Sequence, residues 1–185
     1  MNELSVKFES LEFPSADGKT TIKGKMWAPS GEAAAVRGVV QIVHGMSEHV
    51  ARYDGFARYL VSRGFAVCGN DHIGHGGSVC ASEDLGHISL SAGKEALIAD
   101  VHALRALATE RFGVETPFLL FGHSMGSFIA YAYLARHARR GEGHGLSGCV
   151  LCGTARMPVA LSKGGNALAR ILAILRGIFC GAQRH

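Results

Sequence analysis

The sequence predicts one α/β domain in which a mostly parallel sheet is flanked by helices. From residue 38 onward, short apolar runs typical of buried strands alternate with stretches of helical periodicity. This order of elements favours parallel strands joined by right-handed crossovers. The composition, 185 residues with 48% hydrophobic and 18% charged residues, suits a single globular domain and leaves no room for a second one.

The N-terminal segments predict a β-hairpin followed by the first strand of the parallel region. Residues 4–13 and 20–28 are expected to pair across the turn Ala16-Asp17-Gly18-Lys19, because an Asp-Gly pair between two strand-like runs is typical of a hairpin. Residues 38–43, Gly-Val-Val-Gln-Ile-Val, then predict a buried strand that ends at His44-Gly45.

Helices and strands alternate along the rest of the chain up to residue 152. Helices are expected at about 50–63, 91–112 and 127–137, strands at 65–70, 117–121 and 146–152, and a long loop over 71–90. In open sheets of this kind, ligands bind outside the carboxyl ends of the strands. The loops that follow residues 43, 70 and 121 are therefore the segments expected to carry chemistry.

The most specific chemical signal is Gly122-His123-Ser124-Met125-Gly126, which lies between an apolar strand-like run and a helix-like stretch. This is the pattern of a nucleophile elbow, where a strand turns sharply into a helix and small flanking residues avoid clashes. The pattern alone is weak in a glycine-rich chain, but its strand and helix surroundings strengthen it. Ser124 is therefore the candidate nucleophile, which needs a base and a group to orient that base.

Charge and targeting features exclude several function classes. The net charge is +4, and the basic residues are scattered apart from Arg136, Arg139 and Arg140, so nucleic-acid binding is not expected. The segment after Met1 has neither a basic nor an apolar stretch typical of an export signal, so a cytoplasmic location is expected. No cofactor is implied by any motif.

The cysteines and two histidines raise a metal site as an alternative. The five cysteines are an odd number and are expected to be reduced thiols. Cys149 and Cys152 would point to opposite faces of a strand, so buried packing is favoured over a shared metal ion. His72 and His75 lie beside Asp71, but no further ligand has suitable spacing, so no metal is expected.

Three motifs at successive strand ends resemble one known family. They are His44-Gly45-Met46-Ser47-Glu48-His49 with Arg52-Tyr53, then Asp71-His72-Ile73-Gly74-His75-Gly76-Gly77-Ser78, and then the elbow. Together they resemble the monoacylglycerol lipase and lysophospholipase-like branch of the α/β-hydrolase fold, also called the serine aminopeptidase S33 or Hydrolase 4 group. The resemblance covers about residues 10–160.

The resemblance implies a carboxylic ester hydrolase that cleaves small-molecule acyl esters, such as monoacylglycerols or lysophospholipids, through an acyl-serine at Ser124. It also implies that the backbone N–H groups of Met46 and Met125 form the oxyanion hole. Both roles suit the residues themselves, since the residue after a nucleophile at a helix start has a free N–H and a neighbouring loop can supply the second donor. Met46 can pack its side chain on the core at the same time.

Other polar residues in these motifs are expected to be structural. Glu48 and Arg52 are expected to form a pair at a helix entry, and His49 is grouped with them. His123 is expected to be a packed histidine that points away from the exposed face of the serine. His72 and His75 are assigned no catalytic role, because the resembling loop supports the floor of the active site.

The chain departs from the family after the elbow, where the triad acid and histidine normally follow. The 61 residues after Ser124 contain one acid, Glu142, and three histidines, His137, His144 and His185. Glu142 and His144 lie beyond the elbow helix, at the opposite end of the strands, roughly 20 Å from the serine. The catalytic acid and histidine are therefore expected to be absent from this polypeptide.

Two domain segments and two functional hypotheses follow from this departure. Residues 1–160 are expected to be the N-terminal part of a hydrolase domain that lacks its last strands, and residues 161–185 the truncated start of a cap. Residues 163–180 predict either a cap helix, with weak membrane-surface contact as the lesser outcome, or an ordinary buried helix. The chain is then either a hydrolase completed by a separate C-terminal polypeptide or a non-catalytic fragment that binds acyl ligands.

Overall fold

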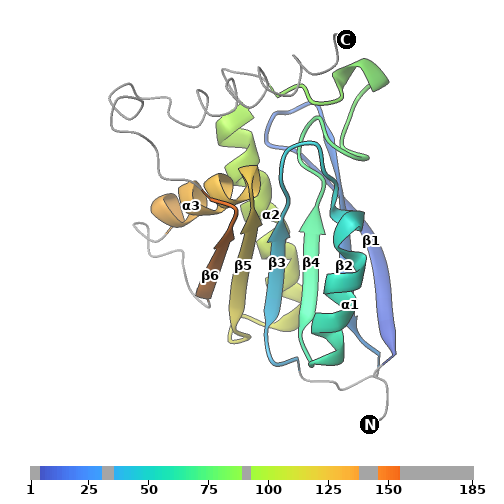
Figure 1. Ribbon diagram of the computed structural model, residues 1–185, viewed down its shortest axis with the longest axis vertical. Helices are drawn as coiled ribbons and strands as arrows, with labels where there is room; N and C mark the ends of the chain where they lie inside the picture. The colour runs from blue at the N-terminus through green and yellow to red at the C-terminus, as the bar shows by residue number, and fades with distance from the viewer. Residues whose placement is uncertain (1–4, 31–35, 89–92, 138–145, 155–185) are drawn as a thin grey trace.

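The computed structural model describes residues 5–30, 36–88, 93–137 and 146–154, and these ranges contain one six-stranded sheet (Figure 1). The strand order is β1-β2-β4-β3-β5-β6. The strands are β1 (Val6–Pro14), β2 (Thr21–Pro29), β3 (Val39–Val43), β4 (Ala66–Asn70), β5 (Phe118–His123) and β6 (Leu146–Cys152). Strands β4, β3, β5 and β6 are parallel to one another. Strand β2 pairs antiparallel with β4 on one side and with β1 on the other. The predicted α/β class with a mostly parallel sheet is confirmed.

Helices cover both faces of this sheet. They are η1 (Val50–Tyr53), α1 (Asp54–Ser62), η2 (Ser82–Asp84), α2 (Gly93–Phe112) and α3 (Met125–His137). One core cluster joins α2 and α3 to Val39 and Val43 of β3, and a second joins α1 to Val40 and Ile42 of the same strand. Because successive side chains alternate between faces, all five residues of β3 are buried. This explains why four of the five residues are apolar, and the buried polar residue, Gln41, donates from Nε2 to the carbonyl oxygen of Val101.

The predicted boundaries differ from the observed ones by a few residues. The helix predicted from residue 50 begins as the 3-10 turn η1 and becomes α-helical only at Asp54, and both hairpin strands begin and end slightly later than predicted. The turn between them is held by Asp17, whose carboxylate accepts hydrogen bonds from the N–H groups of Lys19 and Thr20. An Asp side chain that bonds to the following backbone in this way stabilises a tight turn.

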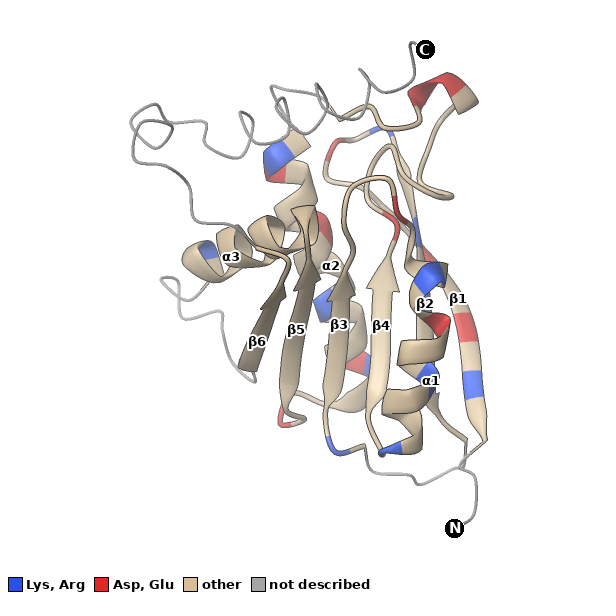
Figure 2. Ribbon diagram, viewed as in Figure 1, with Lys and Arg blue, Asp and Glu red and all other residues tan. Residues whose placement is uncertain are grey.

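The parallel strands bring the three sequence motifs to one edge of the sheet. The first motif follows β3, the second follows β4 and the elbow follows β5, so all three lie at carboxyl ends. Lys, Arg, Asp and Glu are absent from β3, β4, β5 and β6, and charged residues of both signs are distributed over β1, the helices and the loops (Figure 2). In the described ranges we find no helix with the length and hydrophobicity of a bilayer span.

The cysteines of β6 only partly follow the prediction of buried packing. Exposure alternates from Cys149 to Cys152, which agrees with side chains on opposite faces, but Cys149 is only half-buried and Cys152 is exposed. The prediction is therefore wrong for Cys152. The reason is that β6 is paired with β5 along one side only in the described part of the chain. Cys180 lies outside the described residues.

Candidate active site

Ser124 lies at the turn between β5 and α3 with a backbone φ of 51°. Positive φ is uncommon for a residue other than glycine and marks local strain that the surrounding structure must hold. The Ser124 N–H donates to the carbonyl of Cys152 on β6 at 2.9 Å, and the N–H of Ser127 donates to the Ser124 carbonyl at 2.9 Å. The predicted sharp strand-to-helix turn is therefore present at Ser124 and is held by β6 and by the first turn of α3, while the role of Ser124 as nucleophile remains a prediction.

The glycines of the elbow are required by close backbone packing. A Cβ atom on Gly126 would lie 1.9 Å from the carbonyl oxygen of Val43, and one on Gly122 would lie 2.6 Å from the carbonyl oxygen of Gly126. Real Cβ atoms do not approach backbone this closely. The sequence-based requirement for small residues around the serine thus has a specific cause, which is the contact of the first turn of α3 with the end of β3.

The strain at Ser124 should be measurable as a stability difference. We expect Ser124→Gly to be more stable than Ser124→Ala by about 1 kcal/mol, since both remove the hydroxyl but only glycine tolerates positive φ. Urea unfolding followed by the fluorescence of Trp27, the one tryptophan of the chain, measures this difference. Equal stability of the two variants would show that the turn is unstrained.

The loop after β3 lies directly against the serine. A Cβ atom built on Gly45 would lie 3.1 Å from the Cβ atom of Ser124. The next residue, Met46, packs its partly buried side chain on the core, and the Met125 side chain is fully buried. Within the described ranges neither N–H group of these two methionines donates a hydrogen bond. Both segments predicted to supply oxyanion donors therefore flank Ser124, while the roles themselves remain predictions.

Glu48 links this loop to the elbow, which the sequence did not indicate. Its Oε2 atom accepts hydrogen bonds from the Gly45 N–H at 3.0 Å and the Tyr53 hydroxyl at 2.7 Å, and the His123 Nδ1 atom lies 3.3 Å away. Burial opposes its ionisation, but these bonds outweigh burial and lower the pKa of Glu48 below its usual value. The predicted pair of Glu48 with Arg52 is wrong, because these three donors occupy the carboxylate.

His123 also differs from its prediction as a packed residue. Its side chain is 37% exposed and faces the carboxylate of Glu48, with 3.3 Å between Nδ1 and Oε1. The two residues are 75 positions apart, so no local pattern could have paired them. An acid and a histidine thus lie side by side next to Ser124, although in the described part of the chain His123 makes no hydrogen bond to the Ser124 hydroxyl.

Three histidines form a buried cluster beneath the loop that follows β3. The rings of His44 and His72 have centroids 4.1 Å apart, and the His75 ring is 5.5 Å from His44. All three are buried, and burial lowers each pKa, to about 4 for His44. Asp71 holds the surrounding loop by accepting from the N–H groups of Val50 and Gly77. The predicted structural role for this loop agrees with these contacts.

The lowered pKa of His44 predicts a loss of stability in mild acid. An unfolded histidine takes up a proton near pH 6.5, whereas the native His44 resists protonation until about pH 4. Stability should therefore fall as the pH decreases from 6.5 to 4, by roughly 3 kcal/mol for this residue alone. Urea unfolding across this range measures the slope. His44→Asn should flatten the slope whatever its stability at neutral pH, and an unchanged slope would contradict the prediction.

The histidine of α3 is not placed to act as a base. His137 lies at the end of α3, and its ring stacks on His102 and on Tyr133, each with a centroid separation of 4.3 Å. A helix of this length carries the chain roughly 20 Å from its start. Glu142, His144, His185 and the predicted cap helix lie outside the described residues.

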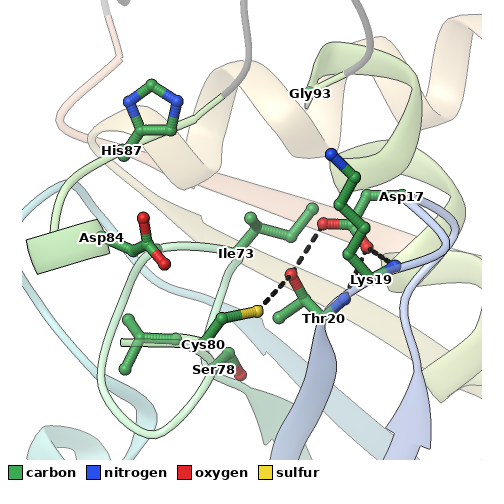
Figure 3. A pocket seen from close by; sticks show the side chains of 11 residues that line it. Asp17, Lys19, Thr20, Ile73, Ser78, Cys80, Asp84, His87 and Gly93 are labelled. Atoms are coloured by element: carbon green, nitrogen blue, oxygen red, sulfur yellow. Dashed lines mark hydrogen bonds between the residues drawn. The ribbon is translucent and has the colours of Figure 1, made fainter. Parts of the chain in front are cut away.

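A cavity of about 350 Å³ lies apart from the elbow (Figure 3). It lies between the hairpin turn and the loop after β4, and its polar lining includes Asp17, Lys19, Cys80, Asp84 and His87. Ser124, Met46 and Met125 do not line this cavity, although Ile73, Gly74 and Ser78 of the second motif do. The geometry that supports chemistry is therefore at the elbow.

The chain is similar to known hydrolases over most of its described length. The sequence profile of the family described as Serine aminopeptidase, S33 (Hydrolase 4) matches residues 34–179. A monoacylglycerol lipase from Mycolicibacterium smegmatis is 32% identical over 120 residues, which are 65% of this chain and 39% of that protein. The monoglyceride lipase of Homo sapiens is 28% identical over 133 residues, which are 68% of this chain and 38% of that protein.

A solved structure agrees with the fold. A thermostable carboxyl esterase from Bacillus coagulans, crystallised with glycerol, superposes with a TM-score of 0.73 at 35% identity, covering 94% of this chain and 51% of that one. The chain thus spans about two fifths of the length of the two lipases and about half of the esterase.

Proposed function

The chain belongs to the serine aminopeptidase S33 (Hydrolase 4) family of α/β-hydrolases, and from this premise we propose that Ser124 is the nucleophile of a carboxylic ester hydrolase. The observation that carries the proposal is the elbow, where Ser124 has a φ of 51° and Gly45 of the neighbouring loop lies against it. A strained serine at a strand-to-helix turn exposes its hydroxyl above the sheet, where a substrate carbonyl can approach.

The proposed reaction proceeds through an acyl-serine. A general base removes the proton from Ser124 Oγ, which attacks the ester carbonyl to give a tetrahedral oxyanion. The N–H groups of Met46 and Met125 donate to this oxyanion, and each donor stabilises the transition state by about 3 to 4 kcal/mol. The protonated base gives its proton to the departing alcohol, and water then releases the acid by the same steps.

The proposed substrates are acyl esters with medium or long chains, such as monoacylglycerols or lysophospholipids. The names of the two lipase relatives and of the esterase structure support an ester, and they favour a hydrolase over a non-catalytic acyl binder.

The remaining parts of the proposal concern residues beyond the described site. We assign residues 1–160 to the hydrolase domain and 161–185 to the start of a cap that contacts membrane surfaces weakly, in a cytoplasmic protein without cofactor or metal. The triad acid and histidine are proposed to lie outside residues 1–185, since Glu142 is the one acid that follows Ser124 in these residues.

A fluorophosphonate probe tests the nucleophile. The chain would be co-expressed with a C-terminal half taken from the Bacillus coagulans esterase, and the co-purifying pair treated with the probe. We expect mass spectrometry to locate the adduct on Ser124, with slow labelling of residues 1–185 alone, because an unactivated serine hydroxyl is a weak nucleophile. Labelling of the Ser124→Ala pair at the same rate would reject Ser124.

A further inference from the structure

The direction of the Met46 N–H depends on the peptide unit that joins Gly45 to Met46. In a trans peptide the C=O and N–H bonds point in opposite directions, and the described residues contain no cis peptide. The Gly45 carbonyl oxygen lies 2.7 Å from Nδ1 of His44. The Met46 N–H therefore points away from the His44 ring, and this contact restrains the orientation of the peptide unit.

The hydrogen bonds of His44 define which ring nitrogen carries its proton. The backbone N–H of His72 donates to His44 Nε2 at 3.0 Å, and because a backbone N–H is always a donor, Nε2 must be unprotonated. A neutral His44 then carries its proton on Nδ1, which donates to the Gly45 carbonyl oxygen. The hydrogen bond from the His72 N–H, in the loop after β4, thus selects the His44 tautomer that holds the Gly45–Met46 peptide.

We propose that His44 is a positioning residue that aims the Met46 N–H into the oxyanion hole through its Nδ1–H hydrogen bond to Gly45. The inference rests on the proposed function, in which Met46 is an oxyanion donor. His44 is fully buried and lies behind the loop, so it touches the donor peptide and not the substrate. Its ring is fixed by a tilted contact with the His72 ring and by the hydrogen bond from the His72 N–H.

Neighbouring contacts hold the preceding peptide and not the donor peptide. Glu48 accepts from the Gly45 N–H, and His72 Nε2 lies 3.1 Å from the His44 carbonyl oxygen, so both act on the unit that joins His44 to Gly45. Among the described side chains, His44 alone is hydrogen-bonded to the unit that carries the Met46 N–H. Removing its donor should therefore release the N–H direction even when the rest of the loop stays in place.

The tautomer can be measured on the unmodified chain. In ¹⁵N-histidine-labelled residues 1–185, long-range ¹H–¹⁵N spectra at neutral pH should show His44 with a protonated Nδ1 and an unprotonated Nε2. This is a signature that activity does not influence. A His44 ring protonated on Nε2 would overturn the proposal.

Three variants then separate positioning from general packing. In His44→Asn the amide N–H takes the place of Nδ1–H, whereas in His44→Gln the amide lies near the position of Nε2. The third variant, His75→Asn, removes a ring of the same cluster that makes no hydrogen bond to Gly45. We expect the Met46 N–H residual dipolar coupling to keep its sign and size in His44→Asn and His75→Asn, and to lose most of its size or change sign in His44→Gln. An unchanged coupling in His44→Gln, or an equal change in His75→Asn, would overturn the proposal.

The two proposals fail in distinguishable ways. If the probe does not label Ser124 in the assembled pair, the proposed function fails, while the tautomer and the couplings still report on the loop. If the probe labels Ser124 but the couplings do not follow His44, then Met46 is aimed by other contacts and only the positioning role is rejected.

Discussion

Residues 1–185 alone are expected to hydrolyse p-nitrophenyl esters at or near the rate without enzyme. The reason is that no histidine of the described chain is bonded to the Ser124 hydroxyl, and His137 is held at the far end of α3 by its two stacking partners. Loss of a serine triad typically lowers turnover by about a millionfold, leaving the contribution of the oxyanion hole and of binding. Initial rates, corrected for spontaneous hydrolysis, measure this.

The control for this prediction is the pair formed with a C-terminal half. If that half supplies the acid and the histidine, turnover should rise by several orders of magnitude, and Ser124→Ala should return it to the level of residues 1–185 alone. The polypeptide also offers an internal alternative, the Glu48 and His123 pair beside Ser124. Turnover by residues 1–185 that Ser124→Ala and His123→Ala both abolish would contradict the prediction and identify that pair as the base.

The elements and the strained turn at Ser124 were predictable because their signals are local. The apolar run of β3, the periodicity of α3 and the glycines around Ser124 each lie within a few residues of the feature that they specify. The parallel arrangement followed from the alternation of strands and helices, and it was enough to place the motifs after β3, β4 and β5 at one edge.

The contacts of Glu48 and His123 were not predictable because they depend on distances in space. Glu48 was expected to interact with Arg52 four residues later, as on a regular helix. The backbone instead forms the 3-10 turn η1 at Val50, and the carboxylate contacts three other groups, from Gly45, Tyr53 and His123. A local charge pattern cannot indicate a partner that arrives from another strand. The same holds for His72, whose backbone N–H selects the tautomer of His44.

Gly126→Ala is expected to prevent stable folding, whereas Gly55→Ala is expected to be neutral or slightly stabilising. The added methyl group at residue 126 would lie 1.9 Å from the carbonyl oxygen of Val43 and 2.5 Å from that of His44. Both atoms belong to the backbone at the end of β3, which is buried and paired on both sides. Neither atom can therefore move without loss of packing or strand pairing. We expect a loss of about 4 kcal/mol or more, a size reached only when the native backbone cannot accept a side chain.

Gly55 provides the matched control, since it also lies in the first turn of a helix, α1, that follows the carboxyl end of a strand. A Cβ atom there would meet no atom within 4 Å, and alanine favours a helix over glycine by up to about 1 kcal/mol. Urea unfolding monitored by Trp27 fluorescence and by circular dichroism compares both variants with the parent chain. Because the close approach of α3 to β3 is what presents Ser124 beside Gly45, a Gly126→Ala variant as stable as Gly55→Ala would mean that the elbow does not have the geometry on which the proposed chemistry depends.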